Sequence, residues 1–208
     1  MKAALSFCCL FFLMACADNA PPPTEHKEPA ARHDTLPIHK EALNPYAAVD
    51  VSPMDISYFP EDYPVMKMSE RVSGPPLARV IYSRPHRQGR TIFGGLLQYG
   101  KPWRLGANEA TEIELFKDAT ILGKKVPAGR YILYCVPEKE SWTICFNSNI
   151  YSWGLRHDEK MDVQQFRIPI SQLTQPIEYF SLVFQKTAAG ADMVMAWDTV
   201  EARLPFSF

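Results

Sequence analysis

Short apolar runs separated by turn residues follow one another from residue 77 to the C-terminus. The clearest is 111–116, in which Thr111, Ile113 and Leu115 alternate with residues that would point to the opposite face. Alternation of this kind is typical of a β-strand that is buried on one side. On this pattern we expect strands over 77–82, 111–116, 131–136, 142–146, 163–170, 179–185 and 193–200.

The same region gives no support for long helices. No window shows a sustained helical period with capping residues at its ends. Roughly 130 residues built from many short strands favour a β-sandwich or a Greek-key barrel. We predict the first of these for residues 77–208: an all-β fold, a single antiparallel β-sandwich of Greek-key or jelly-roll-like type.

The first residues have the pattern of a signal peptide. Lys2 is followed by an apolar run over 3–15, which is too short to span a bilayer as a helix. A leucine three positions before Cys16 and an alanine directly before it resemble the bacterial lipobox, in which the cysteine is lipidated. We therefore expect residues 1–15 to be a lipoprotein signal peptide and Cys16 to carry the acyl chains, palmitate among them. An ordinary signal peptide with an incidental cysteine is the alternative.

Lipidation of Cys16 would place the mature protein in the bacterial cell envelope, anchored on the periplasmic face or at the cell surface. Residues 16–45 are rich in proline and poor in aromatics, so they bury too little apolar surface to fold, and we predict a disordered tether. In residues 46–76 aromatics appear between the prolines. We expect this stretch to be an ordered N-terminal arm that lies over the domain.

The charge balance and the absence of known motifs exclude several classes of function. The net charge is −1 with both signs mixed along the chain, and nucleic-acid binding needs a basic face, so no nucleic-acid partner is expected. The motifs of zinc proteases, serine hydrolases, Walker A loops and Rossmann folds are absent, and we predict no cofactor and no metal. We expect His86 and His157, the histidines of the predicted domain, at its surface.

Two cysteines lie in the predicted domain, on neighbouring strands of one expected hairpin. The even spacing of Cys135 and Cys145 places both on one face in either register that we considered. If Glu138 pairs with Trp142, the cysteines lie opposite each other and could form a disulfide; if the register shifts, they are only diagonal neighbours. A Cys135–Cys145 disulfide is therefore possible on this reasoning.

The most unusual stretch is 81–111, which mixes arginines, Trp103, Asn108 and Glu109 with bulky apolar residues and five glycines. Guanidinium groups bind carboxylates, phosphates or sugar hydroxyls, and tryptophan stacks on sugar faces, so this loop is a candidate recognition site. The alternative is that the same residues hold the sandwich together. In that case Glu109 would pair with an arginine, Asn108 and Ser83 would close turns, and Trp103 would plug one end.

Several sequence blocks resemble a known family. They are A-R-V-I-Y-S-R-P (78–85), G-R-T-I-F-G (89–94), Y-G-K-P-W-R-L-G-A-N-E-A-T (99–111), G-K-K-V-P-A-G-R-Y (123–131), Trp153-Gly154 and A-W-D (196–198). On these blocks, residues 50–208 resemble the bacterial lipoprotein family called domain of unknown function 2911, found in Bacteroidetes-type bacteria. The family carries no established activity, so the resemblance supports the domain and implies no mechanism.

The resemblance does nominate candidate ligand-binding residues, because they match the family signature. They are Arg84, Arg90, Trp103, Arg104, Asn108, Glu109 and Thr111. One departure stands out: the family usually has an arginine two positions after Val163, where this chain has Gln165. An arginine there that paired with Glu109 or met a ligand would be a contact that this chain lacks.

Three functions remain open on the sequence. We favour a non-catalytic binding or accessory module for an envelope glycan, peptide or protein. The second is a hydrolase or lyase in which Glu109 acts as acid or base beside Arg84 or Arg104, with Asp162 as a possible second carboxylate. The third is a structural subunit of the envelope.

Overall fold

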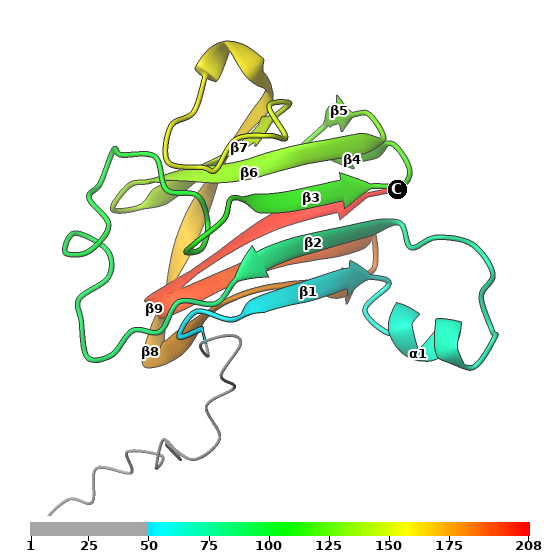
Figure 1. Cartoon of the computed structure of the whole chain (residues 1–208), viewed down its shortest axis with the longest axis horizontal. Coiled ribbons are helices and arrows are strands. Elements are labelled where there is room, and N and C mark those ends of the chain that lie inside the picture. The colour runs from blue at the N-terminus through cyan, green and yellow to red at the C-terminus, as the bar shows by residue number, and fades with distance from the viewer. Residues whose placement is uncertain (1–49) are drawn as a thin grey trace, which may run out of the picture. The chain divides into compact units, whose positions relative to one another are not determined.

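The computed structural model of the chain describes residues 50–208. The predicted signal peptide, the predicted lipidation site Cys16 and the predicted tether lie outside the described residues. The described part consists mainly of antiparallel strands, with very little helix (Figure 1). Its elements in chain order are β1 (Met54–Phe59), α1 (Tyr63–Met68), β2 (Ala78–Ser83), β3 (Thr111–Leu115), β4 (Ala119–Ile121), β5 (Lys124–Val126), β6 (Gly129–Pro137), β7 (Ser141–Asn147), the 3-10 helix η2 (Glu159–Met161), β8 (Asp162–Thr187) and β9 (Gly190–Ser207).

The strands form one nine-stranded sheet in the order β1-β2-β3-β6-β7-β8-β9-β4-β5, which is not closed. Strand β8 belongs to both parts of the sheet: its first part pairs with β7, and from Ile170 onward it pairs with β9. The two parts face each other across the core, and Figure 1 shows β8 and β9 behind β1, β2 and β3. The predicted all-β, antiparallel sandwich is confirmed.

The hydrophobic core fills the space between the two layers. Ring centroids of Phe146 on β7 and Phe206 on β9 lie 6.4 Å apart, and those of Tyr82 on β2 and Phe180 on β8 lie 5.8 Å apart. Burying one such side chain stabilises a fold by roughly 1.5–3 kcal/mol. Aromatic contacts between the layers are therefore a main source of the domain's stability.

The alternation expected over 111–116 is present in β3. Its three inward-pointing residues are buried, whereas Glu112 and Glu114 lie on the outer face. Each glutamate pairs there with an arginine of the neighbouring strand, at 2.7 Å from Arg130 on β6 and 2.7 Å from Arg79 on β2. The outer face of the strand is thus stabilised by cross-strand ion pairs.

Several elements differ from the sequence-based expectation. The runs 163–170 and 179–185 belong to the single long strand β8, whose pairing with β9 is irregular between Gln172 and Ser181. Those intervening residues are mostly exposed and include Pro176, so they show no alternation that would predict a strand. The short hairpin of β4 and β5, which extends the sheet from β9, was also not expected.

Part of the predicted N-terminal arm is a strand of the sheet. All six residues of β1 pair with β2, so residues 54–59 complete one edge of the sandwich rather than lying over it. The helix α1 follows, with a proline in its first turn. No helix within residues 50–208 combines the length and the apolar character that crossing a membrane would require.

The predicted shared face of Cys135 and Cys145 is wrong. Cys135 pairs with Ile144 and Cys145 pairs with Tyr134, a register one residue away from both that we considered. A shift of one residue moves a side chain to the other face of a strand, so the two thiols point to opposite faces of the sheet. Both cysteines are free and buried, and no disulfide joins them.

Candidate ligand-binding site

The long loop between β2 and β3, residues 84–110, crosses one end of the sandwich, at the left of Figure 1. Asp198 of β9 holds this loop through two contacts. One carboxylate oxygen of Asp198 lies 2.8 Å from Nε of Arg87, and the other accepts a hydrogen bond of 3.2 Å from the backbone N–H of Ile92. Asp198 is buried, so the ion pair and hydrogen bond compensate its desolvation and fix the course of the loop.

Trp103 plugs the end of the sandwich beneath this loop. Its backbone exchanges two hydrogen bonds of 2.7 Å with Cys135 on β6, and its indole Nε1 donates to the carbonyl of Gly106 at 3.0 Å. The ring packs against Phe180 and Trp197, with centroids 5.0 and 5.8 Å away, and only 7% of the residue is exposed. Trp103 therefore forms a wall, as the structural alternative proposed, and offers little open ring face for stacking.

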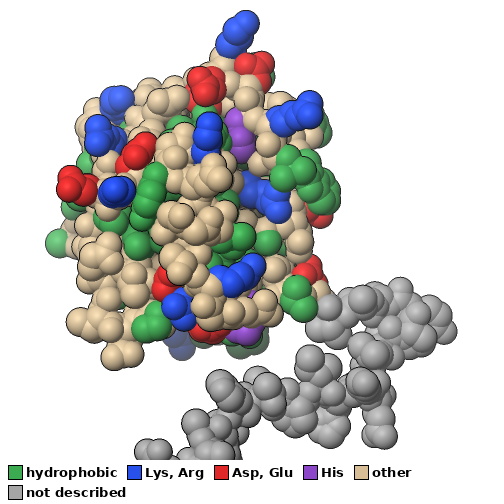
Figure 2. Space-filling view, turned by 90° about the vertical axis from the view of Figure 1, so that its left-hand side faces the viewer, with side chains coloured by type: hydrophobic (Ala, Val, Ile, Leu, Met, Phe, Trp, Pro, Cys, Tyr) green, Lys and Arg blue, Asp and Glu red, His purple; other side chains and the backbone are tan. Residues whose placement is uncertain are grey.

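Above Trp103 lies an open pocket of about 430 Å³, which we call the loop pocket. It is lined by residues 51–52 ahead of β1, by the β2–β3 loop, by Gly154 and Leu155, and by Trp197 of β9. The lining contains two arginines and one histidine and no aspartate or glutamate. Figure 2 faces this end of the molecule and shows basic and hydrophobic side chains beside one another across its middle.

Arg104 is the lining residue with the most unusual environment. Its side chain is half-buried, and no hydrogen bond or ion pair joins its guanidinium to another described residue. The Nε atom is fully buried without an acceptor, and burial lowers the pKa of the guanidinium. A buried N–H without a partner costs about 1–3 kcal/mol, so the folded protein leaves Arg104 in an unfavourable environment.

Arg90 and His86 complete the basic lining. The Nε of Arg90 donates to the carbonyl of Arg87 at 2.9 Å, and one of its terminal nitrogens donates to the carbonyl of His86. His86 stacks on Tyr179 with centroids 4.3 Å apart, and its Nε2 lies 2.8 Å from Oε1 of Glu178. The carbonyls orient Arg90 without neutralising it, and His86 is half-buried rather than fully at the surface.

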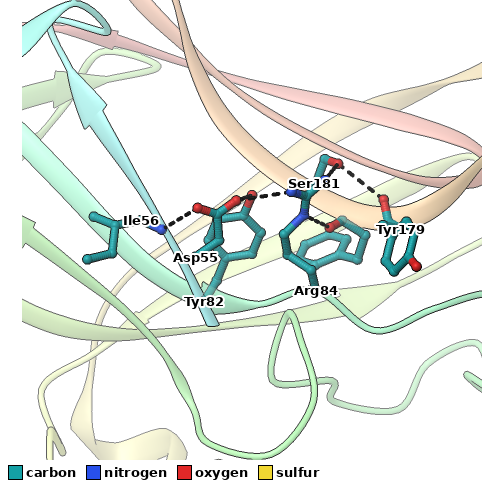
Figure 3. Close-up of polar contacts among 7 residues, drawn as sticks. Asp55, Ile56, Tyr82, Arg84, Tyr179 and Ser181 are labelled. Carbon is teal, nitrogen blue, oxygen red and sulfur yellow. Dashed lines mark hydrogen bonds and ion pairs between the residues drawn. The ribbon is translucent and has the colours of Figure 1, made fainter. Parts of the chain in front are cut away.

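Arg84, a nominated residue, does not line the pocket. Its guanidinium lies 3.2 Å from Oδ2 of Asp55 on β1 and donates to the carbonyl of Phe180 and the hydroxyl of Ser181 on β8, both at 3.4 Å (Figure 3). The same carboxylate oxygen accepts a hydrogen bond from Tyr82. Arg84 thus ties β1 and β2 to β8 and has a structural role.

The other nominated residues also lie outside the pocket. Thr111 is buried and donates to the carbonyl of Leu105 at 2.6 Å. Asn108, at a φ of 57°, donates to Asp50 at 2.6 Å and so holds the segment ahead of β1. Glu109 is exposed and makes no hydrogen bond or ion pair with another described residue, so its predicted arginine partner is absent from the described part of the chain.

Asp162, the possible second carboxylate, lies on the outer face of the sheet. Its two oxygens accept hydrogen bonds from Tyr134 at 2.6 Å, Asn147 at 2.7 Å and Gln165 at 2.8 Å. In this chain Gln165 therefore contacts Asp162 and not Glu109. Neither Asp162 nor Glu109 lines the loop pocket, so the structure brings no pair of carboxylates to it.

His157 belongs to the same cluster and lies only partly at the surface. It is half-buried, and its ring stacks on Tyr134 with centroids 4.1 Å apart. Its Nε2 is buried without a hydrogen-bond partner among the described residues. Burial lowers the pKa of His157, and the nearby Asp162 opposes this.

The sequence did not reveal the aliphatic part of the lining. Leu96 and Leu97 enter it because residues 91–97 form a compact turn, in which the N–H of Leu97 donates to the carbonyl of Ile92 at 2.8 Å. Leu155 enters from the β7–β8 loop, next to Gly154. The Trp153-Gly154 block was the available signal, since a Cβ at Gly154 would lie 2.9 Å from Ala110 and 3.0 Å from Arg104.

Comparison with known proteins identifies a family and no individual relative. The sequence profile described as Protein of unknown function (DUF2911) matches residues 64–206. No significant match was found among curated proteins or among solved structures. The matched region includes the β2–β3 loop, Gly154 and most of the sheet, and it covers more than half of the sequence. The chain therefore belongs to the DUF2911 family.

Proposed function

We propose that this chain is a lipid-anchored protein of the cell envelope whose β-domain is a binding module, and that the loop pocket is its ligand site. The observation that carries the binding role is the lining of that pocket. Four separate segments build an open cavity of about 430 Å³ that contains two arginines and no carboxylate. Cavities of this size with a few converging polar groups are the usual form of small-ligand sites.

The geometry gives less support to the hydrolase or lyase. A general acid or base must come within hydrogen-bonding reach of the substrate, and Glu109 does not line the pocket. Most glycosidases need two facing carboxylates, whereas the hydrogen bonds of Asp162 hold it in the cluster on the outer face. Arg84, the other proposed participant, is engaged with Asp55 and β8.

A purely structural role for the loop also has less support. In that case the arginines of the loop would be paired and its interior filled. Arg84 and Arg87 do pair with carboxylates, but Arg104 has no partner among the described residues and borders an open cavity.

A ligand screen with a blocked pocket tests the binding role. The full-length chain is screened by thermal shift against neutral and acidic oligosaccharides, peptidoglycan fragments and short peptides. A ligand at one hundred times its Kd stabilises the folded state by about 2.7 kcal/mol, which raises the Tm by several degrees. Leu155→Trp fills the mouth of the pocket from an exposed position, and we expect it to abolish the shift.

Met68→Trp is the matched control, because Met68 is exposed on α1, at the other end of the domain in Figure 1. It should leave the ligand-induced shift unchanged. A shift that survives Leu155→Trp would place the ligand elsewhere, and the absence of any shift across the panel would favour a structural role.

The anchor is tested separately. We expect the wild-type chain, expressed in a bacterial host, to incorporate an alkyne analogue of palmitate and to sediment with membranes. Cys16→Ser should lose both properties. Retention of the label by Cys16→Ser would contradict lipidation at that position.

A further inference from the structure

The lining of the loop pocket also indicates which chemical group it accepts. We infer that the pocket binds the carboxylate of a small aliphatic molecule, with Arg104 as the residue that receives the anion. This inference rests on the proposed binding role and names the ligand class for the same site.

The first argument is charge. Several arginines outside the pocket are neutralised within the protein: Arg79 lies 2.7 Å from Glu114, Arg130 lies 2.7 Å from Glu112, and Arg203 lies 2.7 Å from Glu201. The two arginines of the pocket lining have no carboxylate partner among the described residues. A cavity that gathers uncompensated positive charge attracts an anion.

The second argument is the state of Arg104. Its Nε is buried and has no acceptor in the described part of the chain, so the folded protein leaves this N–H unsatisfied. The two terminal nitrogens of a guanidinium form a planar fork that matches the two oxygens of a carboxylate. One carboxylate in the pocket would therefore supply the partner that the Arg104 guanidinium lacks and neutralise its charge.

The third argument concerns the rest of the ligand. Several aliphatic side chains at the pocket are largely exposed, with 74% of Val51, 49% of Leu96 and 69% of Leu155 open to solvent. An apolar ligand group that covers exposed leucine and valine side chains removes their surface from water. Each Å² of apolar surface buried in this way favours binding by roughly 25 cal/mol. A ligand with an aliphatic body next to its carboxylate would bury these side chains.

The same lining argues against a neutral sugar. Trp103 and Trp197 are only 7% and 1% exposed, so neither presents a ring face on which a pyranose could stack. The lining also contains no aspartate or glutamate to accept hydrogen bonds from sugar hydroxyls, and its uncharged amide and hydroxyl side chains are limited to Gln88 and Ser52. Two classes of molecule combine a carboxylate with an aliphatic body: peptides that end in an aliphatic residue, and short fatty acids.

Calorimetric titration of the full-length chain with matched probes tests the inference. The first pair is N-acetyl-Ala-Ala-Leu with a free carboxylate and the same tripeptide as its C-terminal amide. We expect the acid to bind roughly 10- to 100-fold more tightly than the amide, the range for a hydrogen-bonded charge pair. Equal affinities would overturn the inference.

Two further probes distinguish the source of the carboxylate. Octanoate that binds more tightly than the tripeptide acid would assign the site to fatty acids, and the reverse would assign it to peptide ends; either result supports the inference if it depends on Arg104. Inorganic phosphate that binds as tightly as both would overturn it, because the site would then be a general anion site.

The role of Arg104 is tested by Arg104→Gln, which should reduce the affinity for the acid to that for the amide and leave the amide unchanged. Arg104→Lys keeps the charge but not the planar fork, so we expect an intermediate loss of affinity for the acid. This variant replaces Arg104→Gln in the test if the glutamine variant does not fold. Arg71→Gln is the control, since Arg71 is exposed and lies after α1. An acid affinity that is insensitive to both Arg104 variants would overturn the inference.

Failure of the inference and failure of the binding role remain distinguishable. If a neutral ligand binds, Leu155→Trp blocks it and the acid and amide probes do not differ, the pocket is a binding site but not for carboxylates. If no probe and no ligand of the wider screen binds, both proposals fall.

Discussion

The imidazole of His157 stacks on the phenol ring of Tyr134, with ring centroids 4.1 Å apart and planes inclined by 27°. Tyr134 in turn donates to Asp162 at 2.6 Å. Burial and this hydrogen bond raise the pKa of Tyr134, so its phenol stays neutral. The β7–β8 loop is thus held on the outer face of the sheet by two contacts. His157 of the loop stacks on Tyr134, and Tyr134 is hydrogen-bonded to the Asp162 carboxylate.

This arrangement predicts that stability falls in mild acid. Burial lowers the pKa of His157 below its unfolded value of about 6.5. As the pH falls below about 6.5, the unfolded chain binds a proton that the folded chain does not, so the free energy of unfolding decreases until the lowered folded pKa is reached. One proton gives a slope of at most about 1.4 kcal/mol per pH unit.

Urea denaturation at pH 7.5 and pH 5.5 measures this loss. His157→Phe preserves an aromatic ring over Tyr134 and removes the titrating group, so the variant should lose less stability between the two pH values than the wild type. Equal losses in the two proteins would show that His157 does not control the acid response.

The buried thiols of Cys135 and Cys145 should remain reduced. They point to opposite faces of the sheet, and burial raises the pKa of both, that of Cys145 to about 12. Only the thiolate reacts readily, so folded protein should protect both from alkylation. We expect peptide mapping to find both unlabelled after treatment of native protein, and both labelled after denaturation without a reductant. A peptide pair that links them would contradict the observed register.

The main features of the fold could be predicted because they are local. Buried and partly exposed residues alternate over the whole length of strand β3, so five consecutive residues are enough to predict which side chains face the core. The register of β6 and β7 was missed because it depends on how the chain turns between Pro137 and Trp142, and a change of one residue reverses every face. The continuity of β8 depends on its pairing with β9, which no local pattern reveals.

The site was predictable only in part, for a related reason. The nominated residues Trp103, Arg104 and Arg90 do line the pocket, whereas Arg84 and Thr111 serve the framework. Nothing in the residue types separates these two groups, since all of them carry polar or aromatic side chains, in the β2–β3 loop or directly after it. The distinction arises from tertiary contacts, which leave some polar groups satisfied and Arg104 without a partner.

Glu109 provides a direct test against the catalytic alternative. It is exposed, makes no contact by hydrogen bond or ion pair with another described residue, and lies outside the pocket lining. Glu109→Gln should change the free energy of unfolding by less than about 0.5 kcal/mol, as is usual for an isolated surface substitution. Its affinity for any ligand found in the screen should equal that of the wild type. A loss of ligand affinity without a loss of stability would show that Glu109 takes part in ligand binding.

Gly154 connects the stability of the domain to the shape of the pocket. It has a φ of 85°, and a Cβ added there would lie 2.9 Å from the Cβ of Ala110 and 3.0 Å from that of Arg104. Gly154→Ala therefore combines a left-handed backbone with a steric clash, and we expect a loss of about 2–4 kcal/mol in the free energy of unfolding. Because the clash displaces Arg104, ligand affinity should fall as well.

Gly123, in the turn between β4 and β5, separates the two contributions. Its φ is 76°, but a Cβ there would meet no atom within 4 Å, so Gly123→Ala changes the backbone preference alone. Urea denaturation should show a loss of about 1–2 kcal/mol for this variant and a larger loss for Gly154→Ala. Equal losses would mean that the loop around Gly154 moves aside without strain. In that case the contact with Arg104 would not fix the pocket, and ligand affinity should then be unaffected by either substitution.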